Sequence, residues 1–144
     1  MPAPSPIELK RILQSRGFEI YRTTPDEVVL ADRVRDNLLM DSGVAVKLSP
    51  ALAVRVVVRA EGLEFPGERA DELFSRARQL AERALEYREV DTRVVPIRDP
   101  GDPARTLDTW YEVWLERPVL DLEELCSELR RALSLERTAS AGAR

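Results

Sequence analysis

The sequence contains no histidine, and among its 144 residues there is one cysteine, Cys126. Without an imidazole the chain lacks the commonest general base and metal ligand, so a Ser–His or Cys–His arrangement is excluded. A lone thiol cannot close a disulfide within the chain, and it rules out the usual zinc sites. These absences remove most hydrolytic and zinc-dependent chemistry from consideration.

Motifs for phosphate binding and acyl transfer are also missing. The six glycines are scattered, and neither a Gly-rich phosphate loop nor a Gly-x-Ser-x-Gly elbow occurs. Cys126 lies on an apolar stripe with Leu122 and Leu129, which favours a buried thiol over a nucleophile. We therefore predict a protein that is not an enzyme and needs no metal or cofactor. A small enzyme that works through carboxylates alone stays open as an alternative, because 26 acidic residues allow many pairs.

Long apolar runs and excess positive charge are absent too. No stretch of 18 apolar residues occurs, so we expect no membrane partner. Residues 1–6 lack the basic flank and the apolar run of a secretory signal. The net charge is −4 and the isoelectric point about 5.1, which disfavours binding to nucleic acid. Together with the single thiol, these features predict a cytoplasmic protein.

The apolar patterns that are present predict an α+β fold. Its expected core is an antiparallel, twisted sheet of about five to six strands with helices packed against it. The order is a helix, three to four strands, a helix, two strands and a helix. The expected helices are 6–16, 67–88 and 121–136, and the expected strands are 18–23, 27–33, 37–40, 44–48, 52–60, 90–98 and 106–116.

Two turn signals and the chain ends complete this outline. Asp41-Ser42-Gly43 predicts a tight turn between two strands, and residues 99–103 predict a hairpin tip. The length is typical of one domain. We expect a flexible N-terminus over 1–5, a single domain over 6–136 and a disordered tail over 137–144.

Two tryptophans are the most unusual feature of the sequence. Trp110 and Trp114 lie four residues apart, an even spacing, so they share one face of the expected strand 106–116 with acidic residues, while Leu107, Tyr111 and Leu115 occupy the other. Large indoles among acids favour a partner interface. The other interpretation is that a helix covers this face.

The valine-rich strand offers a second set of contact residues. Val54, Val56 and Val58 alternate with Arg55, Val57 and Arg59, so the arginines lie on the polar face. We take Trp110, Trp114, Arg55 and Arg59 as the candidate partner-binding residues. Arginine suits such a role because its guanidinium pairs with carboxylates through two hydrogen bonds.

The order of elements resembles the fold of type III secretion chaperones and YbjN-type proteins. The segments that carry the resemblance are 5–16, 18–60, 68–88, 90–116 and 121–136. The resemblance implies a homodimer whose sheet and helix surfaces hold an extended segment of another polypeptide. We expect a chaperone- or adaptor-like binding module. A regulatory ligand-binding subunit is a further alternative.

Overall fold

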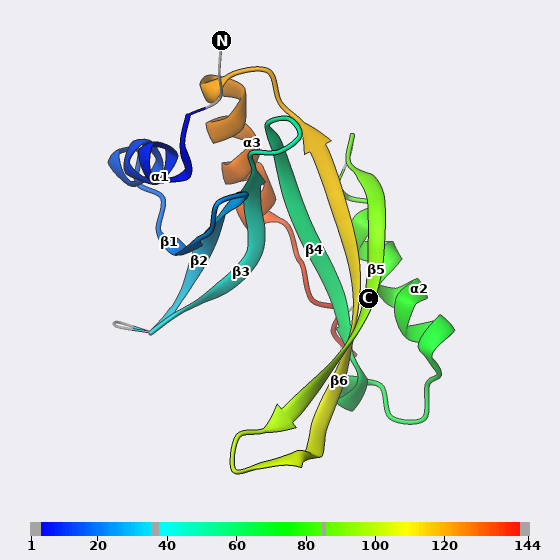
Figure 1. Cartoon of the computed structure of the whole chain (residues 1–144). Helices are drawn as coiled ribbons and strands as arrows, with labels where there is room; N and C mark the ends of the chain where they lie inside the picture. Colours follow the sequence, from blue (N-terminus) through cyan, green and yellow to red (C-terminus); the bar gives the residue numbers. More distant parts are fainter. Residues whose placement is uncertain (1–3, 36–37, 85, 142–144) are drawn as a thin grey trace. The chain divides into compact units, whose positions relative to one another are not determined.

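The computed structural model describes residues 4–35, 38–84 and 86–141. Over these ranges the fold is α+β, as predicted, with helices packed against an open antiparallel sheet (Figure 1). The sheet order is β1-β2-β3-β4-β6-β5. The helices are α1 Pro6–Ser15, α2 Ala70–Ala81 and α3 Leu122–Ser134, with a 3₁₀ turn η1 at Gly62–Glu64. The strands are β1 Ile20–Thr23, β2 Glu27–Arg35, β3 Leu38–Lys47, β4 Ala53–Glu61, β5 Arg88–Asp99 and β6 Asp102–Pro118.

The chain divides into two compact units. The first comprises Met1–Val56 and Glu116–Ser134, and the second comprises Val57–Leu115 and Leu135–Arg144. Both β4 and β6 contribute residues to each unit. The two units are described separately below. No helix within the described ranges is long and apolar enough to cross a membrane.

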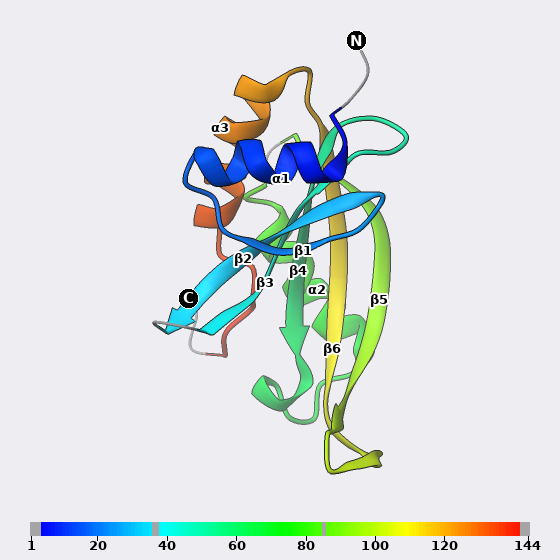
Figure 2. The ribbon, with the colours of Figure 1, turned by 60° about the vertical axis from the view of Figure 1, so that its left-hand side comes forward.

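In the first unit, amphipathic helices bury apolar stripes against valine-rich strands. Helix α1 begins with the predicted capping box, in which Ser5 Oγ accepts a hydrogen bond from the Glu8 N–H at 3.2 Å. It lies across β1 and β2, and it buries Leu9 and Leu13 (Figure 2). The fully buried valines that β2, β3 and β4 contribute to this unit are Val28, Val29, Val44, Val46, Val54 and Val56. Their alternation on β4 confirms the predicted half-buried strand.

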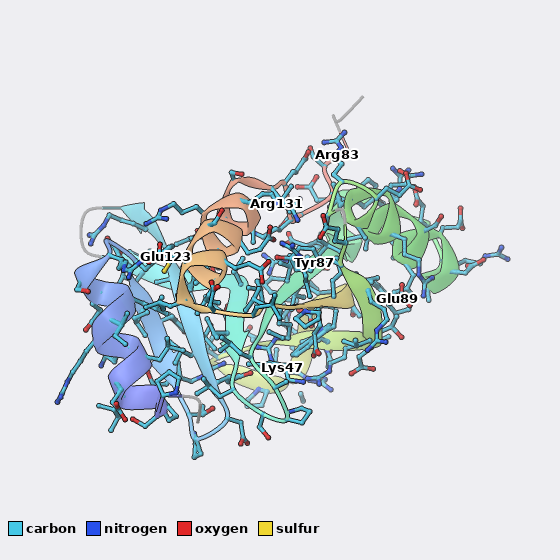
Figure 3. The ribbon with its side chains drawn as sticks, turned by 90° about the horizontal axis from the view of Figure 1, so that it is seen from above. Lys47, Arg83, Tyr87, Glu89, Glu123 and Arg131 are labelled. Atoms are coloured by element: carbon cyan, nitrogen blue, oxygen red, sulfur yellow. The ribbon has the colours of Figure 1, made fainter. Side chains whose placement is uncertain are left out.

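Helix α3 carries one buried charge beside its apolar stripe. Leu125, Cys126 and Leu129 are buried, which confirms the expected buried thiol. The Glu128 carboxylate is buried as well, and it pairs with Arg117 of β6 and with Arg131 one turn further along α3 (Arg131 is labelled in Figure 3). Because a buried carboxylate is costly without partners, these guanidiniums offset the cost of burying Glu128.

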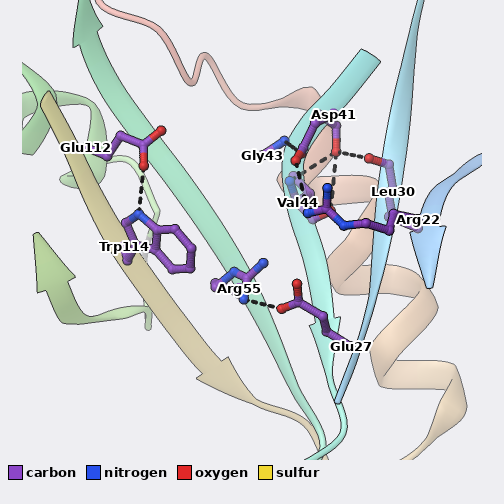
Figure 4. Close-up of polar contacts among 10 residues, drawn as sticks. Arg22, Glu27, Leu30, Asp41, Gly43, Val44, Arg55, Glu112 and Trp114 are labelled. Atoms are coloured by element: carbon purple, nitrogen blue, oxygen red, sulfur yellow. Dashed lines mark hydrogen bonds and ion pairs between the residues drawn. The ribbon is translucent and has the colours of Figure 1, made fainter. Parts of the chain in front are cut away.

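The predicted turn at residues 41–43 is wrong, since β3 runs through it as one strand. Ala31 of β2 lies opposite Asp41 whereas Val29 lies opposite Ala45, so the extra residues form a bulge beside Leu30. Ser42 Oγ donates to the Leu30 carbonyl at 2.8 Å, and the Asp41 carboxylate accepts from the Gly43 N–H (Figure 4). In this bulge Gly43 has φ +79°. Tight turns also need a residue that tolerates positive φ, so the same residue types suit both structures.

Helix α2 is shorter than the predicted 67–88. Gly67 has φ +84°, so the chain before Ala70 is not helical. At the other end, the N–H groups of Arg83 and Ala84 bond to the carbonyls three residues back, and Glu86 has φ +73°. The apolar stripe continues past Ala81, but the chain must turn there to enter β5.

The second unit includes a long hairpin and part of the predicted tail. Strands β5 and β6 extend to the turn at residues 100–101, so both exceed the predicted 90–98 and 106–116. The sequence predicted disorder from residue 137. In the structure the Arg59 N–H donates to the Arg137 carbonyl, and the Ala139 N–H donates to the Arg59 carbonyl, both at 2.9 Å. The predicted flexible and disordered ends over 1–3 and 142–144 lie outside the described residues.

Candidate functional site

The tryptophans of β6 lie on the face of the strand opposite its buried residues. Val113 and Leu115 are buried, whereas Trp110 and Trp114 are only half-buried. Helix α2 packs on the Val113 side, since the ring of its Phe74 meets Tyr111 edge-on at 5.4 Å between centroids. Within the second unit, α2 therefore does not cover the indoles.

Each indole is oriented by an acid two residues earlier on the same strand. Trp110 Nε1 donates to Asp108 Oδ2, and Trp114 Nε1 donates to Glu112 Oε1, each at 3.0 Å (Figure 4 shows Trp114). A carboxylate acceptor makes these hydrogen bonds stronger than neutral ones. The acids that alternate with the tryptophans therefore fix the edge of each ring, and the ring faces are left for other contacts.

An arginine from a neighbouring strand stacks on each indole. Arg59 of β4 places its Cζ 3.8 Å from the Trp110 ring centroid, and Arg93 of β5 lies 3.7 Å from that of Trp114. At these distances the guanidinium is attracted to the electron-rich face of the ring. The result is two matched guanidinium–indole pairs on one face of the second unit.

Each stacked arginine is in turn held by an acid on its own strand. Arg59 Nε lies 2.8 Å from Glu61 Oε2, and Arg93 Nε lies 3.0 Å from Asp91 Oδ2. The hydrogen bond from Arg93 lowers the pKa of Asp91 from its ordinary value. We call this group the tryptophan–arginine surface. It comprises Arg59, Glu61, Asp91, Arg93, Asp108, Trp110, Glu112 and Trp114.

A glycine and a 3₁₀ turn hold one corner of this surface. Asp108 Oδ1 accepts hydrogen bonds from the N–H groups of Leu63 at 3.0 Å and Thr109 at 2.7 Å. A Cβ at Gly62 would lie 3.1 Å from the Thr109 carbonyl oxygen and 3.3 Å from Asp108 Oδ1. Turn η1 can therefore approach β6 and bind Asp108 only because residue 62 has no side chain.

The four predicted contact residues fall into two groups. The structure brings Arg59 and Trp110 into contact, and it places Trp114 on the same face of the same unit. Arg55 belongs to the first unit, where it forms an ion pair with Glu27 of β2 (Figure 4). The sequence did not identify Arg93, because its place over Trp114 depends on how β5 pairs with β6. The sequence does carry a signal for Asp108 and Glu112, because each lies two residues before a tryptophan and so on the same face of the strand.

Cys126 is engaged in packing, and the acids of the α2 region, Glu68, Asp71 and Glu72, are engaged in ion pairs. Cys126 is buried, and its Sγ accepts a hydrogen bond from Arg16 Nη1 at 3.9 Å. A shallow depression on α2 is lined by Glu68, Asp71, Glu72, Ser75, Arg76 and Gln79. There Arg76 donates two hydrogen bonds to Glu68, at 2.7 and 2.6 Å, which lowers the pKa of that carboxyl. Over the described ranges, no group of three or more acids, cysteines and histidines converges on a possible metal position.

Comparison with known proteins adds no relative. The chain matches no model of a protein family, no curated protein and no solved structure. The resemblance to type III secretion chaperones and YbjN-type proteins therefore stays a prediction, and function must be inferred from the site itself.

Proposed function

We propose that the protein is a non-enzymatic binding module, chaperone- or adaptor-like, which holds another polypeptide on the tryptophan–arginine surface. The observation that supports this proposal is the pair of half-buried indoles, each stacked under an arginine and on the face of β6 opposite α2. Tryptophan and arginine are the residues that contribute most at protein interfaces. We further propose that the module is a cytoplasmic homodimer.

The arrangement suits a binding surface because its side chains are already ordered. Hydrogen bonds from Trp110 and Trp114 to Asp108 and Glu112 fix both rings, so little side-chain entropy is lost when a partner binds. The stacked guanidiniums place positive charge beside each apolar ring. Apolar side chains of a partner can pack on the rings while its polar groups pair with the arginines and their acids.

A pull-down from the native cell with matched variants tests this proposal. The double variant Trp110→Ala/Trp114→Ala should lose the polypeptides that the unchanged chain captures, while it keeps a cooperative melting transition. Tyr21→Ala is the control, since Tyr21 is an exposed aromatic residue of the first unit. If the double variant melts without cooperativity, the indoles are part of the core. If it folds and captures the same polypeptides, the surface is not the binding site.

A further inference from the structure

The edge strand β5 exposes apolar side chains, and on its outer side no strand of the described residues pairs with it. Within the described ranges β5 is the last strand of the sheet, next to β6 alone (Figure 1). All its residues from Arg88 to Val94 are exposed, and Val90 and Val94 retain 41% and 55% of their accessible surface. An edge of this length with exposed valines is a template for pairing with another strand.

The exposed part of β5 is complementary to itself. Residues 90–94 read Val-Asp-Thr-Arg-Val. When two copies of this segment run antiparallel with Thr92 opposite Thr92, Asp91 of each copy lies opposite Arg93 of the other. In the same register Val90 lies opposite Val94. Opposite charges, matched valines and paired threonines are the cross-strand neighbours that stabilise antiparallel pairs.

Other registers of the same pairing are unfavourable. In an antiparallel pair, residues directly opposite each other both turn their backbone groups toward the partner or both turn them away. When a twofold axis relates two copies of one strand, the axis must therefore pass through a residue that lies opposite the same residue of the other copy. Centring on any other residue from Glu89 to Val95 sets two like charges opposite each other, for example Asp91 against Asp91 or Glu89 against Asp99. The charges thus select Thr92.

We propose that β5 is the homodimer interface, and that it pairs antiparallel with β5 of a second copy of this chain about a twofold axis at Thr92. The sheet then continues from one copy into the other. Pro96, which lacks an N–H group, lies outside the central five residues of the ladder. This interface rests on one part of the proposed function, the homodimer. It does not require the tryptophan–arginine surface to bind a polypeptide.

The pairing has a consequence for the tryptophan–arginine surface. Residues opposite each other in a sheet point to the same face, so Asp91 of one copy and Arg93 of the other lie on one side. Arg93 stacks on Trp114 and lies 3.0 Å from Asp91 within its own strand. The dimer would therefore join the two tryptophan–arginine surfaces on one face, around a neutral cluster of two acids and two guanidiniums. A partner chain could bind both surfaces at once.

Charge reversal tests both the contact and its register. Sedimentation equilibrium of the full chain should give twice the monomer mass of 16.3 kDa. Asp91→Arg alone, or Arg93→Asp alone, sets like charges opposite each other and should raise the dimer dissociation constant at least about tenfold. An equimolar mixture of these two variants should restore the dimer as a heterodimer, because each variant then faces opposite charges. The double variant Asp91→Arg/Arg93→Asp should also restore it. Asp71→Arg, a reversal at an exposed site on α2, is the control and should leave the dimer unchanged.

A cysteine scan provides a readout that does not depend on charge. In a Cys126→Ala background, Thr92→Cys should cross-link two copies under oxidation, while Arg98→Cys, six residues from the axis, should not. A chain that stays at 16.3 kDa over the whole concentration series would overturn the proposal. So would a dimer that survives both single reversals, or one that cross-links through residue 98 and not 92. Circular dichroism melts show whether each variant is folded, and the Trp110→Ala/Trp114→Ala variant should still dimerise whether or not the proposed polypeptide binding holds.

Discussion

Arg59 of β4 lies over the ring of Trp110 of β6, with its Cζ 3.8 Å from the ring centroid, while its Nε is held by Glu61. This contact joins two strands on the face of the second unit opposite α2. Two predicted contact residues therefore support each other before any partner is present, so the surface has a measurable stability of its own.

A double-mutant cycle should detect this contact. We expect Arg59→Ala and Trp110→Ala to show a coupling energy of about 1 kcal/mol in urea unfolding, because the stacking is lost in either single variant. Tyr21→Ala combined with Arg59→Ala is the control and should be additive, since Tyr21 belongs to the first unit. A coupling energy of zero would show that the contact between the guanidinium and the indole adds no stability.

The close approach of η1 to β6 makes Gly62 sensitive to substitution. Gly62→Ala places a Cβ 3.1 Å from the Thr109 carbonyl oxygen, so Asp108 and Trp110 must shift. We expect a loss of about 1–3 kcal/mol in the free energy of unfolding and a change in tryptophan fluorescence. Gly101→Ala is the matched control, because its Cβ would lie at an ordinary 3.5 Å from Asp99 Oδ1. Equal effects at both positions would contradict this explanation.

The core of the first unit predicts a contrast between two leucines. Leu129 of α3 is fully buried, whereas Leu120 just before that helix is 91% exposed. Leu129→Ala should cost about 2–5 kcal/mol of stability through lost burial and the cavity that remains. Leu120→Ala should change stability by less than about 0.5 kcal/mol. Urea or thermal unfolding measures both, and comparable losses would show that α3 is not packed as described.

Two arginines of α2 form ion pairs that predict how the stability of the protein changes in acid. Hydrogen bonds from Arg76 and Arg78 hold the pKa values of Glu68 and Glu89 below the ordinary glutamate value (Glu89 is labelled in Figure 3). A carboxyl group whose pKa is lower in the folded chain adds stability that is fully present above the unfolded pKa, about 4.3 for glutamate. This contribution is lost as the pH falls through the lower folded-state value.

Urea unfolding at a series of pH values therefore should show stability falling once the pH drops below about 4.3. Arg78→Gln removes the partner of Glu89, so the same fall should be shallower in this variant. An unchanged pH profile in Arg78→Gln would mean that the Glu89 pair adds nothing to folding. Nuclear magnetic resonance titration of the Glu89 carboxyl carbon measures its pKa directly in both chains.

Local patterns predicted most of the elements, but not where they end. The alternation of Val54, Val56 and Val58 and the capping box at Ser5 both depend on neighbouring residues, and both are present. The bulge in β3 was taken for a turn, because residues 41–43 suit either structure. Helix α2 ends at Ala81 although its apolar stripe continues, since the path into β5 is set by pairing with a strand distant in sequence.

The candidate site shows the same division between local and distant information. Trp110 and Trp114 stand out in the sequence, and Arg59 follows from the polar face of the valine strand. Arg93 could not be assigned, because the strand positions that meet across β5 and β6 depend on the register of the hairpin. Arg55 shares its face of β4 with Arg59, yet it forms its ion pair with Glu27 of the first unit.

Arg59 donates its N–H to the Arg137 carbonyl and accepts from the Ala139 N–H, so residues 137–139 are connected to the tryptophan–arginine surface. Among the described residues, β3 pairs with β4 from Ala53 to Val56, and residues 137–139 supply main-chain partners to β4 at Arg59. The backbone that aims the Arg59 guanidinium at Trp110 is thus supported from the carboxyl-terminal side. A change of the chain at residues 137–139 therefore acts on Trp110 through the backbone of Arg59.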